Sequence, residues 1–190
     1  LAARGFDLAL IDSRSDSAQA TIEAVCARDG LATVHRADIA DVSGHGLLLD
    51  QIANESGPIA CLVHGGTSQH DLSSDPLAIE PSVFDRLVEH DLRGTFFFTQ
   101  AAAQRMVDST TGIPRSIITV ATDDSSRDYA GRTCDLVGAS LRAMTSMFAR
   151  RLAPFEIGVF EVRPRRTGTS VPCAREDFAS SPRSRRSSGV

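Results

Sequence analysis

The sequence of 190 residues contains no lysine and no tryptophan, and all twenty of its basic residues are arginines. Tyrosine occurs once, at Tyr129. A catalytic pair of tyrosine and lysine therefore cannot be assembled from any part of this chain. Arginine is a poor replacement for the lysine, because its guanidinium does not lose its proton and presents a different donor geometry.

Other absences exclude whole classes of protein. The four cysteines show no C-x-x-C spacing, which is typical of a reducing compartment, so we expect a cytoplasmic protein without a disulfide framework. The five histidines show no paired spacing, and we expect no metal site. Because no apolar run reaches the length that a bilayer requires, we also expect no membrane span.

Charge is distributed unevenly along the chain. Seven arginines and two carboxylates follow Val162, and the formal net charge of the whole chain is −4, so the first 162 residues carry about −9. Nucleic acids are bound through contacts between basic side chains and phosphates. A domain this acidic is therefore not expected to bind nucleic acid.

The segment from Ser116 to Pro164 has the clearest organisation. Apolar runs at 117–121 and 157–162 predict two strands, and Pro154 ends a helical pattern between them. A strand, a long helix and a strand form a parallel βαβ unit with a right-handed crossover. The apolar face of the helix recurs at steps of four, three, four and four residues: Val137, Leu141, Met144, Phe148 and Leu152.

Strands and helices alternate over the rest of the chain as well. The predicted strands are 6–12, 31–35 and 59–63, and the predicted helices are 16–28, 41–54 and 84–106. Alternation of this kind implies an α/β fold, namely a Rossmann-like, doubly wound parallel sheet with helices on both faces.

The chain changes character near its end. Arginine and serine dominate residues 165–190, and no apolar period continues there. Such a composition is typical of disorder. We therefore expect one domain over 1–164 and a disordered tail over 165–190.

The βαβ segment resembles the catalytic region of short-chain dehydrogenases/reductases, and most closely that of 3-oxoacyl-(acyl-carrier-protein) reductase-like enzymes. The matching residues are Leu141-Arg142-Ala143-Met144-Thr145, Phe148-Ala149, Leu152-Ala153-Pro154 and Val162-Arg163-Pro164. The resemblance implies NAD(P)-dependent interconversion of a carbonyl and an alcohol, with a small molecule or a 3-oxoacyl thioester as substrate.

At the catalytic positions of that family the chain departs from the pattern. Cys134 stands at the tyrosine position, Gly138 at the lysine position, and the serine position falls at Ala121 or Thr122. Asp91, in Asp-x-x-Gly, matches an Asn-x-x-Gly whose asparagine supports a proton relay; a solvated helix residue is the alternative. We therefore expect no intact catalytic set and negligible activity.

Four positions match those that hold the dinucleotide in the family. Asp12 ends the first strand, where a carboxylate accepts hydrogen bonds from the adenosine ribose and favours NAD over NADP, although Arg14 could meet a 2′-phosphate. Asp38 matches an aspartate that contacts adenine, and Gly65 and Gly66 let backbone approach a ligand closely. The alternative for Asp12 is a residue of a turn at the strand end, for Asp38 a helix N-cap, and for the two glycines a plain turn. NAD or NADP is therefore the expected cofactor, weakly bound.

The first strand of the family and its glycine-rich phosphate loop have no counterpart here, and neither has the last strand. We therefore expect an N-terminally incomplete sequence. Because the first strand lies in the centre of the family's sheet, its absence is expected to leave two strand edges without backbone partners.

The resemblance also implies a homo-oligomer. In the family the two long helices, here 84–106 and 134–153, pack into a four-helix dimer face. Phe97, Phe98 and Met147 are expected on the outer faces of these helices. A non-catalytic protein that acts through dimer or partner association is therefore the alternative function.

Overall fold

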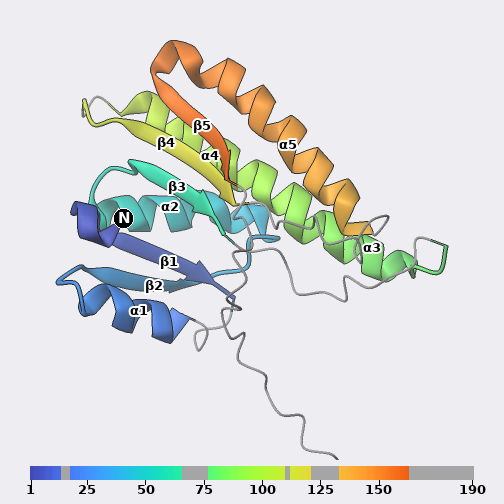
Figure 1. Ribbon diagram of the computed structural model, residues 1–190, viewed down its shortest axis with the longest axis horizontal. Helices are drawn as coiled ribbons and strands as arrows, with labels where there is room; N and C mark the ends of the chain where they lie inside the picture. Colours follow the sequence, from blue (N-terminus) through green and yellow to red (C-terminus); the bar gives the residue numbers. More distant parts are fainter. Residues whose placement is uncertain (14–17, 66–76, 110–111, 121–132, 163–190) are drawn as a thin grey trace, which may run out of the picture.

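The computed structural model describes residues 1–13, 18–65, 77–109, 112–120 and 133–162. Five strands alternate with helices in these ranges (Figure 1). The strands are β1 (Leu8–Asp12), β2 (Ala32–Arg36), β3 (Cys61–His64), β4 (Arg115–Val120) and β5 (Ile157–Val162). The 165–190 tail lies outside the described residues, so its disorder stays a prediction.

The strands form two parallel sheets rather than one. β1 pairs with β2, and β3, β4 and β5 pair in that order. Figure 1 shows β1 lying beside β3, but the two strands do not pair. Within the described residues, the edges of β1 and β3 that face one another therefore have no strand partner. The predicted doubly wound fold, interrupted where a central strand is missing, is confirmed.

The helices divide between the two faces of the sheets. α1 (Gln19–Cys26) connects β1 to β2 in one direction, whereas α2 (His45–Ser56), α4 (Thr95–Asp108) and α5 (Thr133–Leu152) belong to connections that run in the other. Right-handed crossovers in opposite directions place helices on opposite faces. In agreement, α2 packs on α4, α4 packs on α5, and α1 packs on β2.

The core lies between β3–β5 and the helices α4 and α5. Ile117 and Met106 are fully buried there, and the predicted face of α5 is buried against them, with Met144 at 6% and Phe148 at 8% exposed. Burying side chains of this size stabilises a fold by about 1.5–3 kcal/mol each. The predicted apolar face of α5 is therefore confirmed.

The opposite face of the second sheet is partly open. Val63, Ile118 and Phe160 lie in one row across the strands, because Val63 is in register with Ile118 and Ile118 with Phe160. Val63 is 41% and Phe160 is 55% exposed. Parallel sheets usually have both faces covered. At this row of side chains, the described helices cover only one face of the sheet.

The helix predicted over 84–106 consists of three pieces. α3 (Pro81–Leu87) leads into a π-helical segment, η4 (Val88–Gly94), which continues into α4. A π-turn accommodates one extra residue, so it rotates everything after it by about 100° relative to an uninterrupted α-helix. The expectation that Phe98 lies on an outer face is therefore wrong: Phe98 is 3% exposed and belongs to the core.

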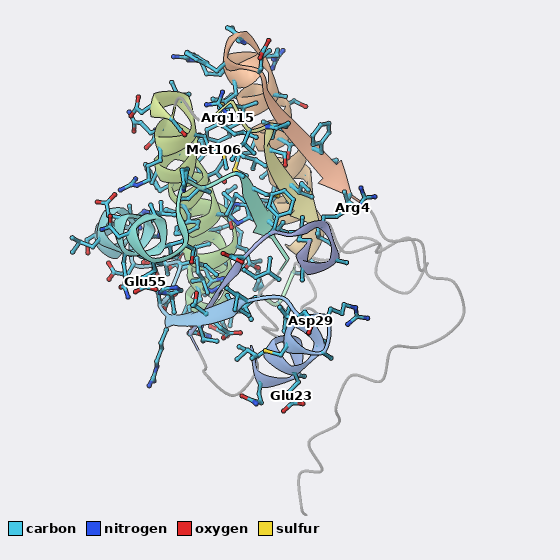
Figure 2. The ribbon with its side chains drawn as sticks, turned by 90° about the vertical axis from the view of Figure 1, so that its left-hand side faces the viewer. Arg4, Glu23, Asp29, Glu55, Met106 and Arg115 are labelled. Carbon is cyan, nitrogen blue, oxygen red and sulfur yellow. The ribbon has the colours of Figure 1, made fainter. Side chains whose placement is uncertain are left out.

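Arg115 joins two helix ends at the start of β4 (Figure 2). Its guanidinium donates hydrogen bonds to the carbonyls of Met106 and Ser109 at the end of α4, with 3.0 Å to Ser109. It also donates to the carbonyl of Phe155, at 3.0 Å, in the short helix η5 (Ala153–Phe155) after α5. A cation is favourable at helix carboxyl ends, where unpaired carbonyls gather.

Replacing Arg115 by leucine is expected to lower the free energy of unfolding by about 2–3 kcal/mol, because several partly buried carbonyls lose a charged donor. Urea unfolding followed by circular dichroism measures the loss. Arg142→Leu, on the exposed surface of α5, is the matched control and should change stability by no more than about 0.5 kcal/mol. Equal losses in both variants would show that the three carbonyl contacts contribute nothing.

Candidate functional site at the carboxyl edge of the sheets

The carboxyl ends of the strands gather the residues that the sequence singled out. Asp12 is the last residue of β1, Asp38 follows β2 by two residues, and Gly65 follows β3 directly. In open α/β sheets, ligands bind outside the carboxyl ends of the strands. This edge is therefore the candidate site.

Asp38 and Asp41 have different local roles. The Oδ1 of Asp38 accepts a hydrogen bond from the backbone N–H of Ala40 at 2.9 Å. Asp41 is the N-cap of η3 (Val42–Gly44), where its Oδ1 accepts from the Ser43 N–H at 3.1 Å and from the Ser43 hydroxyl at 2.6 Å. The hydroxyl bond holds the pKa of Asp41 below its ordinary value. The helix-cap alternative therefore applies to Asp41, and Asp38 remains available.

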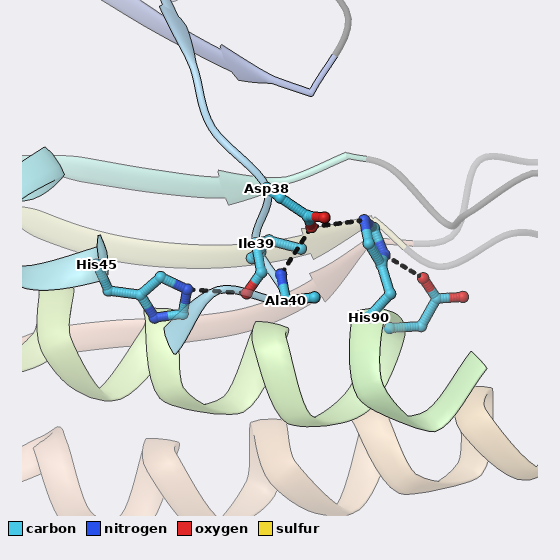
Figure 3. Close-up of polar contacts among 6 residues, drawn as sticks. Asp38, Ile39, Ala40, His45 and His90 are labelled. Atoms are coloured by element: carbon cyan, nitrogen blue, oxygen red, sulfur yellow. Dashed lines mark hydrogen bonds and ion pairs between the residues drawn. The ribbon is translucent and has the colours of Figure 1, made fainter. Parts of the chain in front are cut away.

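His90 bridges two carboxylates that are far apart in the sequence (Figure 3). Its Nδ1 lies 2.8 Å from Oδ1 of Asp91, and its Nε2 lies 4.0 Å from Oδ1 of Asp38. The hydrogen bond to Asp91 raises the pKa of His90 above its ordinary value; partial burial opposes this, and the charges of Asp91 and Asp38 reinforce it. The imidazole thus lies between two carboxylates, an arrangement that favours its charged form.

Asp91 is not the solvated helix residue that the sequence allowed. Its side chain is only 3% exposed, inside the π-helical η4. A buried carboxylate requires a charged or hydrogen-bonding partner, and His90 supplies one. π-helical turns are frequent at functional sites. The presence of this one supports the carboxyl edge of the sheets as the candidate site.

Gly94 brings η4 into direct contact with the Asp38 turn. A Cβ atom at Gly94 would lie 2.5 Å from the carbonyl oxygen of Ile39 and 3.2 Å from the backbone nitrogen of Ala40. The Ile39 carbonyl also lies 2.8 Å from Nε2 of His45, which therefore carries the proton and donates it. The turn that presents Asp38 is thus contacted by Gly94 on one side and by His45 on the other; Figure 3 shows the bond from His45 to Ile39.

A second histidine closes the end of β3. Nε2 of His64 lies 2.8 Å from the hydroxyl of Thr99, which donates its own proton to the carbonyl of Thr95 at 2.7 Å. The His64 ring must therefore donate from Nε2. Burial beside Thr99 and the Phe98 ring, whose centroid is 6.3 Å away, lowers the pKa of His64 to about 4. This imidazole is neutral at pH 7.

The structure brings some of the predicted site residues together and leaves others outside. Asp38 and Asp91 are linked through His90, and Asp12 and Gly65 lie at the same edge of the sheets. A Cβ atom at Gly65 would meet nothing within 4 Å, so the space beside it is open. Gly66, Thr122 and the side chain of Cys134 lie outside the described residues.

Gly138 lies on α5, where an added Cβ would also meet nothing within 4 Å. It is four residues after Cys134, so the two positions share one face of the helix.

Metal-binding clusters and membrane-spanning helices are both absent from the described residues. No group of three or more histidine, cysteine or acidic residues there is arranged to hold a metal ion. None of the helices described is both long and apolar enough to cross a bilayer.

His90 is the site residue that the sequence analysis missed. His90 has no second histidine at the spacing of paired metal ligands, so the spacing of the histidines did not indicate it. The signal that could have indicated His90 is the dipeptide His90-Asp91, which lies three residues before Gly94. Neighbouring imidazole and carboxylate groups can form a hydrogen bond in a π-helical turn, as these two do here.

The chain is similar to known proteins in both sequence and fold. A family model described as enoyl-(acyl carrier protein) reductase matches residues 1–186. A crystal structure of 3-oxoacyl-[acyl-carrier protein] reductase from Brucella melitensis is 37% identical, with a TM-score of 0.77, over 86% of this chain and 67% of that chain. The chain belongs to the short-chain dehydrogenase/reductase family.

Further members are similar to the same extent. A structure of the Brucella melitensis reductase in complex with NAD is 36% identical, with a TM-score of 0.75, over 86% of this chain and 65% of that one. A short-chain dehydrogenase/reductase from Sinorhizobium meliloti 1021 is 35% identical, with a TM-score of 0.71, over 86% of this chain and 69% of that one. The search of curated proteins gave no match. The chain thus spans about two thirds of the length of these solved relatives.

Proposed function

We propose that residues 1–164 form a dinucleotide-binding unit of the short-chain oxidoreductase type, which takes NAD or NADP at the carboxyl edge of its sheets. Asp38 carries this proposal. One of its oxygens is fixed by the Ala40 N–H, yet its side chain is 58% exposed, so it can accept a further hydrogen bond from a ligand. The NAD complex of a 36% identical relative supports the same cofactor class.

The residues present fit one end of such a cofactor. Asp12 and Asp38 are carboxylates at positions suited to the ribose and adenine, and the open space at Gly65 leaves room for a ligand next to β3. Asp12 favours NAD over NADP, because a carboxylate accepts from ribose hydroxyls and repels a 2′-phosphate. The sequence has no glycine-rich phosphate loop, so we expect weak binding.

The chain as written is proposed to lack catalytic turnover. Bound nicotinamide would supply the hydride for reduction of a carbonyl such as that of a 3-oxoacyl thioester. Proton transfer to the carbonyl oxygen is the part that this chain does not provide, since Cys134 and Gly138 occupy the tyrosine and lysine positions and lysine is absent altogether. General acid–base help is worth about 10²–10⁴ in rate.

Nucleotide binding is tested by thermal unfolding of the full chain with and without NADH and NADPH. We expect a cooperative transition whose midpoint rises with NADH more than with NADPH, because a ligand that binds only the folded state stabilises it by mass action. Asp38→Asn should abolish most of the rise. A midpoint unmoved by millimolar concentrations of either nucleotide would refute the proposed function.

A second candidate function is association without catalysis. Met147 is 43% and Leu136 is 53% exposed on α5, so that helix presents apolar side chains to solvent. Sedimentation velocity of the full chain and of Met147→Arg distinguishes the two: an assembly through α5 should dissociate in the variant. Phe98→Arg is unsuitable for this purpose because Phe98 is buried in the core.

The cytoplasmic location expected from the cysteine pattern stays a prediction.

A further inference from the structure

His90 has no part in the function proposed above, yet its position is unusual. Its side chain is 33% exposed and lies between a carboxylate of its own helical segment and one from the turn after β2. The two carboxylates are 53 positions apart in the sequence, at Asp38 and Asp91. The fold therefore brings this triplet together at the candidate site.

Asp91 fixes the orientation of the imidazole. Its side chain is only 3% exposed, and its Oδ1 lies 2.8 Å from Nδ1 of His90. Since a carboxylate accepts hydrogen bonds, the proton of the neutral ring resides on Nδ1. The ring is thereby held with Nε2 towards Asp38, 4.0 Å from its Oδ1.

Asp38 is held through one oxygen. Its Oδ1 accepts from the Ala40 N–H at 2.9 Å and is also the atom that faces His90. Both contacts use the same oxygen, so Oδ2 is left for a ligand. When His90 is protonated, Nε2–H attracts Oδ1 and restrains the carboxylate; when His90 is neutral, Nε2 presents a lone pair to it and the two groups repel.

We propose that His90 is a positioning residue for the adenine end of the nucleotide site: by bridging Asp91 and Asp38 it orients the Asp38 carboxylate to accept a hydrogen bond from the exocyclic amino group of an adenine nucleotide. This inference rests on the proposed function. It adds that adenine-nucleotide affinity depends on the charge of His90. The charged groups that act on His90 in the described structure are Asp91 of its own segment and Asp38 of the facing turn.

The test measures dissociation constants of NADH and of 5′-AMP at pH 6 and pH 8.5. The proteins are the full wild-type chain, His90→Gln, Asp38→Asn and the double variant, with Glu89→Gln as the control, since Glu89 is exposed on the same segment. At pH 6 we expect His90→Gln to bind about fivefold more weakly than wild type, the worth of one modest hydrogen bond. At pH 8.5 the difference should be smaller, because a rise in pH removes the proton that attracts Asp38.

Each outcome decides a different point. If the wild type binds neither nucleotide, the proposed function fails and the role of His90 fails with it. If the wild type binds and His90→Gln matches it at both pH values, only the role of His90 is overturned. An equal weakening at both pH values, or an unchanged effect of His90→Gln in the Asp38→Asn background, would identify a merely structural role and also overturn it.

A second measurement uses only the wild-type protein, so it does not depend on whether a variant folds. The imidazole signals of wild type are titrated by NMR with and without 5′-AMP. Because the charged ring is proposed to favour binding, 5′-AMP should raise the pKa of His90 further by linkage. A His90 titration curve that saturating 5′-AMP does not move would overturn the proposal.

Discussion

Replacing Gly94 by alanine is expected to destabilise the protein by about 3 kcal/mol, near the upper end of the cost of overpacking. The added Cβ would lie 2.5 Å from the carbonyl oxygen of Ile39 and 2.9 Å from its carbonyl carbon. Both are backbone atoms of the turn that carries Asp38, so they cannot move aside as a flexible side chain can. The clash outweighs the roughly 1 kcal/mol that alanine gains over glycine in a helix.

Gly138→Ala is the matched control for this prediction. Gly138 lies within α5, and a Cβ there would meet nothing within 4 Å. Only the helix propensity changes, so Gly138→Ala is expected to stabilise the protein by up to about 1 kcal/mol. Urea unfolding of both variants measures the difference. If Gly94→Ala is as stable as Gly138→Ala, that result would contradict the close contact between η4 and the Asp38 turn.

Acid is expected to destabilise the protein through His64. Burial lowers the pKa of His64 to about 4 in the folded state, from an ordinary value of 6.5. As the pH falls below 6.5 the unfolded chain takes up the proton first, whereas the folded protein resists until about pH 4. The free energy of unfolding therefore decreases by about 1.4 kcal/mol per pH unit in this window, on the order of 3 kcal/mol in all.

His64→Gln tests this assignment, because the amide can still donate to Thr99 but does not titrate. Its stability, measured by urea unfolding between pH 7 and pH 4.5, should fall more gently than that of wild type. His90→Gln is the contrasting variant: the pKa of His90 is raised, so its contribution is present at low pH and lost as the pH rises through the folded value. Identical slopes for wild type and His64→Gln would contradict the burial of His64.

The sequence was most informative where packing repeats. The apolar spacing of α5 correctly predicted a buried face that includes Val137 and Leu152, because a 3.6-residue period leaves little choice of which side meets the sheet. The gap between β1 and β3 followed from the resemblance to the family, since the missing strand is central.

The errors came from the π-helical segment. A helical pattern over 84–106 contains no residue that marks a π-turn, and the extra residue turned Phe98 from the expected outer face into the core. The same segment buried Asp91 and placed His90 against Asp38. These contacts depend on how closely η4 approaches the Asp38 turn, which no local pattern records.

The candidate site was predictable in part. Asp12, Asp38 and Gly65 follow strands, and strand ends meet at one edge of a parallel sheet, so their neighbourhood was foreseen from order alone. The contacts of His64 with Thr99 and of His90 with Asp38 were not foreseen, since each joins residues 35 or more positions apart.

The unpaired edges of β1 and β3 also have a consequence for local opening. Among the described strands, β1 pairs with β2 alone, and α2 links this pair to the rest of the fold by packing on both β1 and α4. The β4 strand, by contrast, has a neighbour on each side. Native-state amide exchange should therefore divide the protein into two cooperative units, in which the amides of β1 and β2 exchange with solvent well before those of β4.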